Sequence, residues 1–219
     1  MQNAAAESLA QSILSITPSL LWFFLVLGLF VAFYRQIRDE VLPNISGISA
    51  AGLVELKIMR NKVSNAIKLA EKSPNWTVHI TAAQRKTIVD RASRSVELFE
   101  HSVILWVDDH PENNVNEVGM LQDLKAEVVQ VTNNDAALTL FAKRNFDVVL
   151  SDISRTDDPT AGLKLAPLLR EAGHASVPVI LYVGVYEPAR GVPPHAFGVT
   201  NRPDTMLHLV IDALERRGC

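Results

Sequence analysis

Three aspartates and one arginine have residue types and positions that suit phosphoryl-transfer chemistry. Asp108 and Asp109 follow one short apolar run, and Asp152 follows a second. Arg202 follows a third. Carboxylates brought together repel one another unless a hard cation lies between them, and Mg²⁺ is usually held by one or two carboxylates with waters and phosphate oxygens. A carboxylate beside Mg²⁺, with a cationic side chain opposite, meets the needs of phosphoryl transfer to an aspartate. The alternative is a set of solvated acids at strand ends.

The apolar runs are expected to be the strands of an α/β fold. Five of them alternate with helical patterns in the second half of the chain, which predicts a parallel sheet covered by helices on both faces. The expected strands cover residues 103–107, 128–131, 148–150, 177–183 and 197–200. In a doubly wound sheet, polar site residues gather at the carboxyl ends of the strands. The fold class predicted for residues 103–219 is therefore a five-stranded, doubly wound parallel sheet with the acids and the arginine at one edge.

The same segments resemble response-regulator receiver domains, whose fold is flavodoxin-like. Residues 104–111 are similar to the acidic-pair motif of that family, and residues 147–153 are similar to the strand that bears its phosphoacceptor aspartate. Gly162 follows at the spacing of the family's glycine after the phosphoacceptor loop. Residues 177–181 resemble the fourth strand, and residues 196–203 resemble the last strand with its basic residue and cis-proline. The motifs follow the family's order along the whole domain.

The resemblance implies a role for each of the singled-out residues. Asp152 would be the phosphoacceptor, and Mg²⁺ would be held by Asp108, Asp109 and Asp152 together with the backbone carbonyl of Ser154. Arg202 would be the base on the phosphate side, because its guanidinium can bind phosphate in bidentate fashion. The chain would then be a phosphoprotein of two-component signal transduction and not an enzyme. Its partner would be a histidine kinase or another phosphodonor.

Two departures from the family keep other functions open. Val183 stands where the family has a Ser or Thr that bonds the phosphoryl group, and residues 186–194 contain three prolines where the fourth helix is expected. The main alternative is a phosphorylation-independent pseudo-receiver that acts as an interaction or oligomerisation module, in a defence or stress system. A third possibility is a nucleotide-related effector that uses the same sheet edge, because a fold does not fix a function.

An uncharged run near the N-terminus predicts a membrane anchor. Residues 1–11 form a short tail, and residues 12–34 contain no charged side chain, which suits a transmembrane helix. The basic residues Arg35 and Arg38 lie behind this run, so the positive-inside rule places the C-terminal side in the cytoplasm. We therefore expect a single-pass protein of the inner membrane with its N-terminus outside. A secretory signal peptide and a buried core helix are the alternatives.

The segment between anchor and sheet is predicted to be a basic, mostly helical connector. Residues 35–102 carry 11 Lys or Arg and 7 Asp or Glu, whereas residues 103–219 carry 10 and 16. A strand is expected at residues 54–58, and helices after it and at 82–99, where Thr81 and Gln84 form a capping-box pattern. The connector would be a spacer, or a signal-relay element that forms a homo-dimer. Sparse aromatic residues argue against nucleic acid as a partner, and the single cysteine, Cys219, excludes an intramolecular disulfide framework.

Overall fold

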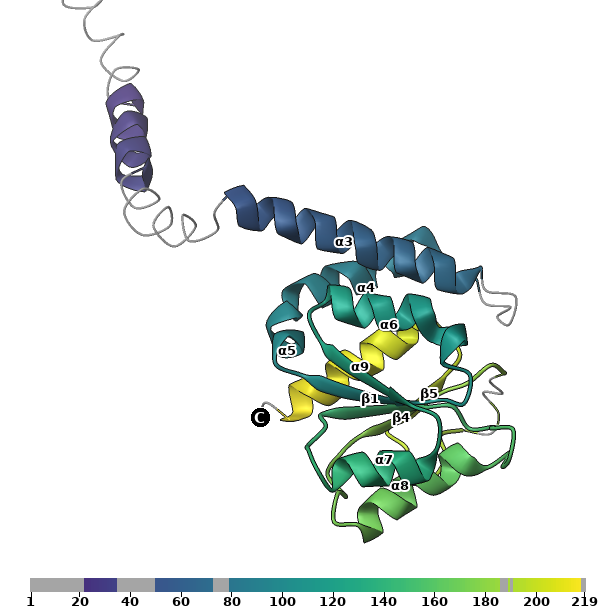
Figure 1. Ribbon diagram of the computed structural model, residues 1–219. Helices are drawn as coiled ribbons and strands as arrows, with labels where there is room; N and C mark the ends of the chain where they lie inside the picture. The colour runs from purple at the N-terminus through teal and green to yellow at the C-terminus, as the bar shows by residue number, and fades with distance from the viewer. Residues whose placement is uncertain (1–21, 35–49, 73–78, 186–188, 190, 218–219) are drawn as a thin grey trace, which may run out of the picture. The chain divides into compact units, whose positions relative to one another are not determined.

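The computed structural model has two compact units, residues 1–54 and residues 55–219. It describes residues 22–34, 50–72, 79–185, 189 and 191–217 (Figure 1). In the first unit residues 22–34 form a helix with exposed apolar side chains. Within the ranges just given, no helix is both long and apolar enough to cross a membrane. The rest of the predicted span, residues 12–21, and the predicted tail lie outside the described residues.

The second unit contains the predicted five-stranded parallel sheet. Neighbouring strands follow the order β2-β1-β3-β4-β5, and every pairing is parallel. The strands are β1 (Val103–Val107), β2 (Glu127–Val131), β3 (Val148–Ser151), β4 (Val179–Tyr182) and β5 (Gly198–Thr200). All residues of β3 and β4 are buried, which is why these strands have continuous apolar sequences. The α/β fold class predicted from the sequence is confirmed.

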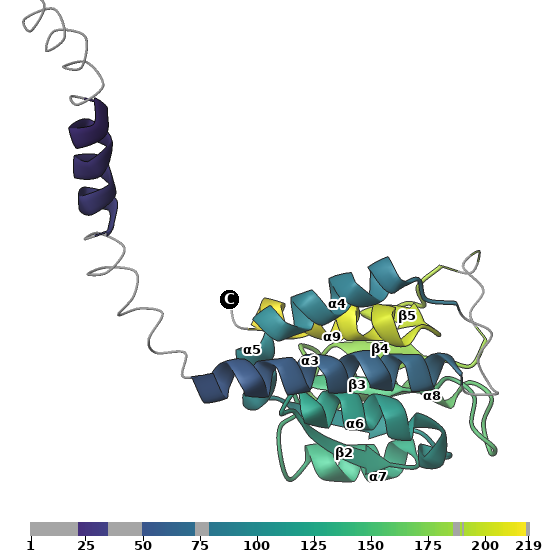
Figure 2. The same cartoon turned by 90° about the horizontal axis from the view of Figure 1, so that it is seen from above.

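Helices cover both faces of the sheet (Figures 1 and 2). On one face lie α7 (Asn134–Phe141) and α8 (Ala161–Glu171). On the other face lie α6 (Val115–Asp123), preceded by the short helix η2 (Pro111–Asn114), and α9 (Pro203–Arg217). The side chains of β1 alternate between the two faces. Leu105 packs with α7 and α8, whereas Trp106 packs with α6 and α9. This alternation follows from the two-residue period of a strand.

The connection between β4 and β5 differs from the other crossovers. In its described part, which leaves out residues 186–188 and 190, no helix covers the sheet. The cis-proline implied by the resemblance is not found, because the described residues contain no cis peptide bond. Pro203 instead occupies the first position of α9, where its fixed φ angle suits a helix.

The segment predicted as a connector folds into three helices. They are α3 (Ala50–Glu71), α4 (Ala82–Arg94) and α5 (Val96–Glu100). The strand predicted at residues 54–58 is wrong, because these residues are part of α3. Met59, Val63, Ile67 and Ala70 recur every three or four residues and are buried, so the helical period prevails over a short alternation. The capping box is confirmed, since the Thr81 side chain accepts a hydrogen bond from the Gln84 backbone and the Gln84 side chain accepts one from the Thr81 backbone N–H.

These three helices form an outer layer on the sheet unit. Their buried side chains belong to the same core as the apolar residues of α6 and α9. Arg91 of α4 pairs with Asp212 of α9 at 2.6 Å, and Lys62 of α3 pairs with Asp123 of α6 at 2.7 Å. The compact unit thus begins at Glu55. Much of the apolar surface of these helices is covered within the chain, but Ile58 and Leu69 of α3 are 51% and 55% exposed.

The packing of this layer predicts that two substitutions on α3 have unequal effects on stability. Ile67 is fully buried, whereas Leu69 is 55% exposed two residues away. We expect Ile67→Ala to lower the free energy of unfolding by about 2–5 kcal/mol, because it leaves a cavity in the shared core. Leu69→Ala should change it by less than about 0.5 kcal/mol. Urea denaturation measures both values, and equal midpoints for the two variants would contradict the packing of α3 on the core.

Candidate functional site

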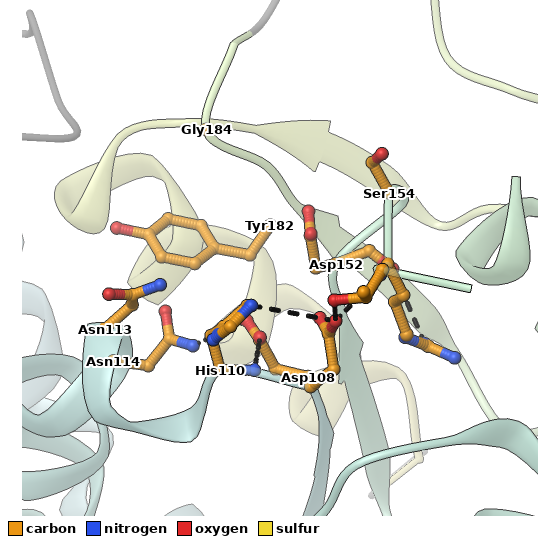
Figure 3. Close-up of a pocket in the computed structure, with 11 residues that line it drawn as sticks. Asp108, His110, Asn113, Asn114, Asp152, Ser154, Tyr182 and Gly184 are labelled. Carbon is orange, nitrogen blue, oxygen red and sulfur yellow. Dashed lines mark hydrogen bonds and ion pairs between the residues drawn. The ribbon is translucent and has the colours of Figure 1, made fainter. Parts of the chain in front are cut away.

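A pocket lies at the carboxyl ends of β1, β3 and β4 (Figure 3). Its volume is about 400 Å³. The loop after β1, the loop after β3 and the end of β4 supply its lining, which includes Asp108, Asp109, Asp152, Ser154, Tyr182 and Gly184. Three strands that run in parallel end at the same edge of a sheet, and their following residues therefore meet. The pocket is the place where the sequence predicted a site.

Four of the five predicted site residues line this pocket. They are Asp108, Asp109, Asp152 and Ser154. Arg202 does not line it, because its guanidinium is bound elsewhere. Its Nε and Nη2 donate to the Asp204 carboxylate at 3.0 and 2.8 Å. Its Nη1 donates to the backbone carbonyl of His79 at 3.3 Å, so Arg202 connects the start of α9 with the segment before α4.

The acidic pair after β1 is fixed by hydrogen bonds. Asp108 is buried and accepts from the backbone of His110 and from the side chain of Asn114, both at 2.7 Å. The Oδ2 atom of Asp109 accepts from the Thr156 backbone at 2.8 Å and from the Thr156 hydroxyl at 2.6 Å. Burial raises the pKa of Asp109, but the hydrogen bonds from Thr156, a bond from the Asp109 backbone and the charge of His110 together lower its pKa overall. The Asp109–Thr156 bonds join the loops that follow β1 and β3.

Asp152 is the carboxyl group whose ionisation the pocket disfavours. Burial, followed by the charge of Asp108, raises the pKa of Asp152 to about 6. The backbone N–H of Ile153 and the charge of Arg155 act in the opposite direction. Figure 3 shows the carboxyl group of Asp152 between Tyr182 and Ser154. A buried carboxylate with an acidic neighbour gains stability from any cation that enters the pocket.

Arg155 is a pocket residue that the sequence analysis did not select. Its side chain is buried, and it donates to Asn134 at 2.6 Å and to the Ser151 hydroxyl at 2.8 Å. Burial lowers its pKa, and the charges of the pocket acids counteract this effect. Three carboxyl groups line the pocket, and Arg155 and His110, whose pKa is raised by Glu112 and Asp109, are the basic side chains of the lining. The sequence signal was its position three residues after Asp152, where the resemblance assigned no role.

Glu117 and Tyr182 form a buried pair beside the pocket. The Tyr182 hydroxyl donates to Oε1 of Glu117 at 2.8 Å, and Glu117 is only 1% exposed. Burial raises the pKa of Glu117, which the bond from Tyr182 only partly offsets. Tyr182 also packs edge-on against Trp106. The sequence signal for this pair was available, since Glu117 shares the helical stripe of the core residues Leu121 and Leu124.

Gly162 has a steric role close to Asp152. A Cβ atom at this position would lie 2.1 Å from the backbone oxygen of Asp152 and 2.7 Å from the Cα of Ile153. Its N–H donates to the Ile153 carbonyl at 3.0 Å. Only glycine permits this approach of α8 to the loop after β3, which accounts for the glycine noted in the sequence.

The pocket suits a hard divalent cation bound by few protein ligands. Among the residues that the structure describes, no three His, Cys, Asp or Glu side chains form a group arranged to hold a metal ion. A smaller donor set fits, because Asp108 and Asp152 interact through their charges and the lining carries an excess of negative charge. Ions that keep most of their water need only one or two carboxylates. Asp109 remains engaged with Thr156 in this arrangement.

The similarities to known proteins concern the sheet unit. No protein-family model matches the chain, and no curated protein matches it. Solved receiver domains are similar to it. The response regulator TrrA from Thermotoga maritima, in complex with Mg²⁺ and BeF, is 23% identical; the match covers 51% of this chain and 98% of that chain, with a TM-score of 0.45. A Francisella response-regulator receiver domain is 18% identical; the match covers 53% of this chain and 99% of that chain, with a TM-score of 0.46. A CheY-like receiver protein from Methanospirillum hungatei is 19% identical; the match covers 53% of this chain and 96% of that chain, with a TM-score of 0.46.

The raised pKa of Asp152 predicts a pH-dependent effect on stability. A carboxyl group with a pKa of about 6 in the folded state binds its proton more tightly than in the unfolded state, where the ordinary value is 3.8. The folded protein therefore loses stability as the pH rises from about 4 to about 6, and does not regain it above that range. With allowance for solvent screening, Asp152→Asn should stabilise the fold by about 1–2 kcal/mol at about pH 7.5 and by little at about pH 4.

Denaturation at the two pH values measures this difference. Asp157→Asn is the matched control, because Asp157 is an exposed acid in the same loop and does not line the pocket. A gain for Asp152→Asn of the same size at both pH values would contradict the abnormal proton affinity.

Proposed function

We propose that this chain is a membrane-tethered, receiver-like signalling protein whose Asp152 accepts a phosphoryl group with Mg²⁺ and passes the change to partner proteins. The proposal rests on one observation above all. Asp152 follows the central strand β3 in an acid-lined pocket, next to Asp108, and has a pKa raised to about 6. Perturbed carboxyl groups in pockets are frequent at functional sites. The parallel sheet of order β2-β1-β3-β4-β5 supports the receiver-like architecture.

Residues of this chain can carry out each step of the proposed reaction. Asp108 and Asp152 would hold Mg²⁺ with the carbonyl oxygen of Ser154, and the ion would supply positive charge to the phosphoryl oxygens. A carboxylate oxygen of Asp152 attacks the phosphorus of the donor, which is a phosphohistidine of a kinase or a small acyl phosphate. The new P–O bond forms as the bond from phosphorus to the donor breaks. Asp109 holds the loop in place through Thr156.

Arg202 supplies a route from the pocket to the outer helices. Its guanidinium lies with Asp204 and donates to the carbonyl of His79. A phosphoryl group on Asp152 adds negative charge at the same end of the sheet. We infer that this charge attracts Arg202 away from His79. The segment before α4 then loses a hydrogen bond, and the surface of α3 and α4 becomes the signal that partners recognise.

The remaining parts of the proposal rest on the sequence. The uncharged run 12–34 with Arg35 and Arg38 behind it supports a single-pass anchor in the inner membrane, with the sheet unit in the cytoplasm. We propose a signalling protein that is not itself an enzyme and has no nucleic-acid partner. We also propose a homo-dimer through the outer helices, for which the exposed apolar side chains of Ile58 and Leu69 on α3 offer a surface.

Phosphorylation of Asp152 is directly measurable. Incubation of the full-length chain with Mg²⁺ and acetyl phosphate should add the mass of one phosphoryl group to the intact protein. Asp152→Asn should abolish the addition, because an amide is not a nucleophile for phosphorus. Asp157→Asn, which changes an exposed acid of the same loop, should leave it intact. An unmodified wild-type chain, or modification that persists in Asp152→Asn, would refute the proposed reaction.

A second candidate function is a phosphorylation-independent interaction module. Two observations favour it: Asp108 and Asp109 already accept hydrogen bonds within the chain, and Val183, which cannot bond a phosphoryl group, is buried in the core. On this alternative, Asp152→Asn keeps the activity of the protein in its cell, whereas Ile67→Ala, which disrupts the outer layer, removes it. On the phosphorylation proposal Asp152→Asn removes that activity.

The Arg202 route predicts a local change in backbone protection. Beryllofluoride with Mg²⁺ is used as the phosphoryl mimic, and amide hydrogen exchange is followed by mass spectrometry. Exchange at residues 79–82 should become faster, since the bond from Arg202 to His79 is lost. Arg202→Gln should show the faster exchange without the mimic, and Arg216→Gln, an arginine at the far end of α9, should not. Exchange at residues 79–82 that is the same with and without the mimic would contradict the route.

A further inference from the structure

We propose that a groove between α3 and α4 binds a phosphate-bearing anion. This site is separate from the acidic pocket and does not depend on the function proposed for Asp152. The groove has a volume of about 240 Å³. Its polar lining consists of Arg60, Asn61, Ser64 and Lys68 from α3 and Arg85 and Lys86 from α4. We call it the basic groove.

Two cations of the basic groove share one carboxylate. Arg60 and Lys86 both bind Asp90, and the distance from Lys86 Nζ to Asp90 Oδ2 is 2.8 Å. Asp90 carries one negative charge, so one positive charge of this cluster is left uncompensated. Lys86 reaches Asp90 from the preceding turn of α4, while Arg60 reaches it from α3. The cluster therefore joins the two walls of the groove and still attracts an anion.

The other two cations add a second uncompensated charge. Arg85 pairs with Glu71 at 3.1 Å and donates to the carbonyl of Ile80 at the same distance. Its Nε atom is buried and has no hydrogen-bond partner among the described residues. Lys68 is exposed, and no ion pair to it is found within the described part of the chain. Four cations face two carboxylates, which leaves a net charge of +2.

Neutral donors and a helix terminus complete the site. Asn61 and Ser64 offer an amide and a hydroxyl between the two charged clusters. Ala82, the first residue of the 13-residue helix α4, also lines the groove. The amino end of a helix carries partial positive charge and favours anions. A phosphate monoester, with a charge near −2 and three acceptor oxygens, matches this charge and this number of donors. A single carboxylate matches neither.

Two sources could present such a group, and binding experiments separate them. The full-length chain is titrated with inorganic pyrophosphate by calorimetry. It is also titrated with a short-chain, water-soluble phosphatidic acid, so that binding does not depend on the proposed membrane anchor. Lys68→Gln removes an exposed cation of the groove, and Lys57→Gln is the control, because Lys57 is an exposed cation of the same helix outside the groove. Loss of one charge-assisted contact should weaken binding by roughly tenfold in Lys68→Gln and little in Lys57→Gln.

Each outcome decides the proposal. Pyrophosphate binding that depends on Lys68 supports a site for a soluble phosphorylated molecule. Binding of only the short-chain phosphatidic acid, again dependent on Lys68, supports a site for a lipid headgroup. Three results would overturn the proposal: equal losses in the two variants, which indicate diffuse attraction by the basic surface; no binding of either probe; or tighter binding of duplex DNA than of both probes.

Discussion

The burial of Asp152 next to Asp108 is the constraint from which the rest of the site follows. Loss of water and repulsion by Asp108 both destabilise the ionised form of Asp152, and its pKa therefore rises to about 6. The positive charge of Arg155 offsets part of this rise in the pKa of Asp152. That guanidinium is itself buried and must be hydrogen-bonded. Asn134 at the start of α7 and Ser151 at the end of β3 supply its partners, so the surroundings of Asp152 extend to a helix on one face of the sheet.

Hydrogen bonds to the acidic side chains also connect the loops around the pocket to one another. Thr156, from the loop after β3, binds Asp109 with two hydrogen bonds, and Asn114 binds Asp108. Gly162 lets α8 begin against the backbone of Asp152. Side chains fixed in this way on strand ends keep their positions with little loss of entropy when a ligand enters.

The sequence predicted what depends on local patterns and failed where contacts between distant segments decide. Continuous apolar runs gave the parallel sheet, and the carboxyl ends of its strands gave Asp108, Asp109 and Asp152. Residues 54–58 were misassigned as a strand because a short alternation resembles part of a helical stripe, and only the burial of Met59 and the residues after it distinguishes the two.

Two features of the site were beyond single-sequence arguments. Arg202 was expected at the phosphate because its place in the sequence matches a family motif, yet Asp204 lies two residues away and binds its guanidinium. Arg155 was not predicted as a site residue, yet it lines the pocket. Its position there depends on a hydrogen bond to Asn134 of α7, which the local sequence around Arg155 does not reveal. The outer helices showed apolar stripes in the sequence, but the surface that covers them, formed by α6 and α9, is specified by residues far along the chain.

One segment, residues 79–80, contacts both Arg202 at the start of α9 and Glu71, the carboxylate that pairs with Arg85 of the basic groove. The Glu71 carboxylate accepts from the Ile80 backbone at 2.9 Å and pairs with Arg85 of the groove, and the hydrogen bond from Ile80 is the main cause of its lowered pKa. From the other side, Arg202 donates to the carbonyl of His79. An anion that binds Arg85 competes with Glu71 for its guanidinium, and a charge that attracts Arg202 removes a bond from His79. If both proposed events occur, they would act on the same short stretch of backbone, and any effect of one site on the free energy of binding at the other would be reciprocal.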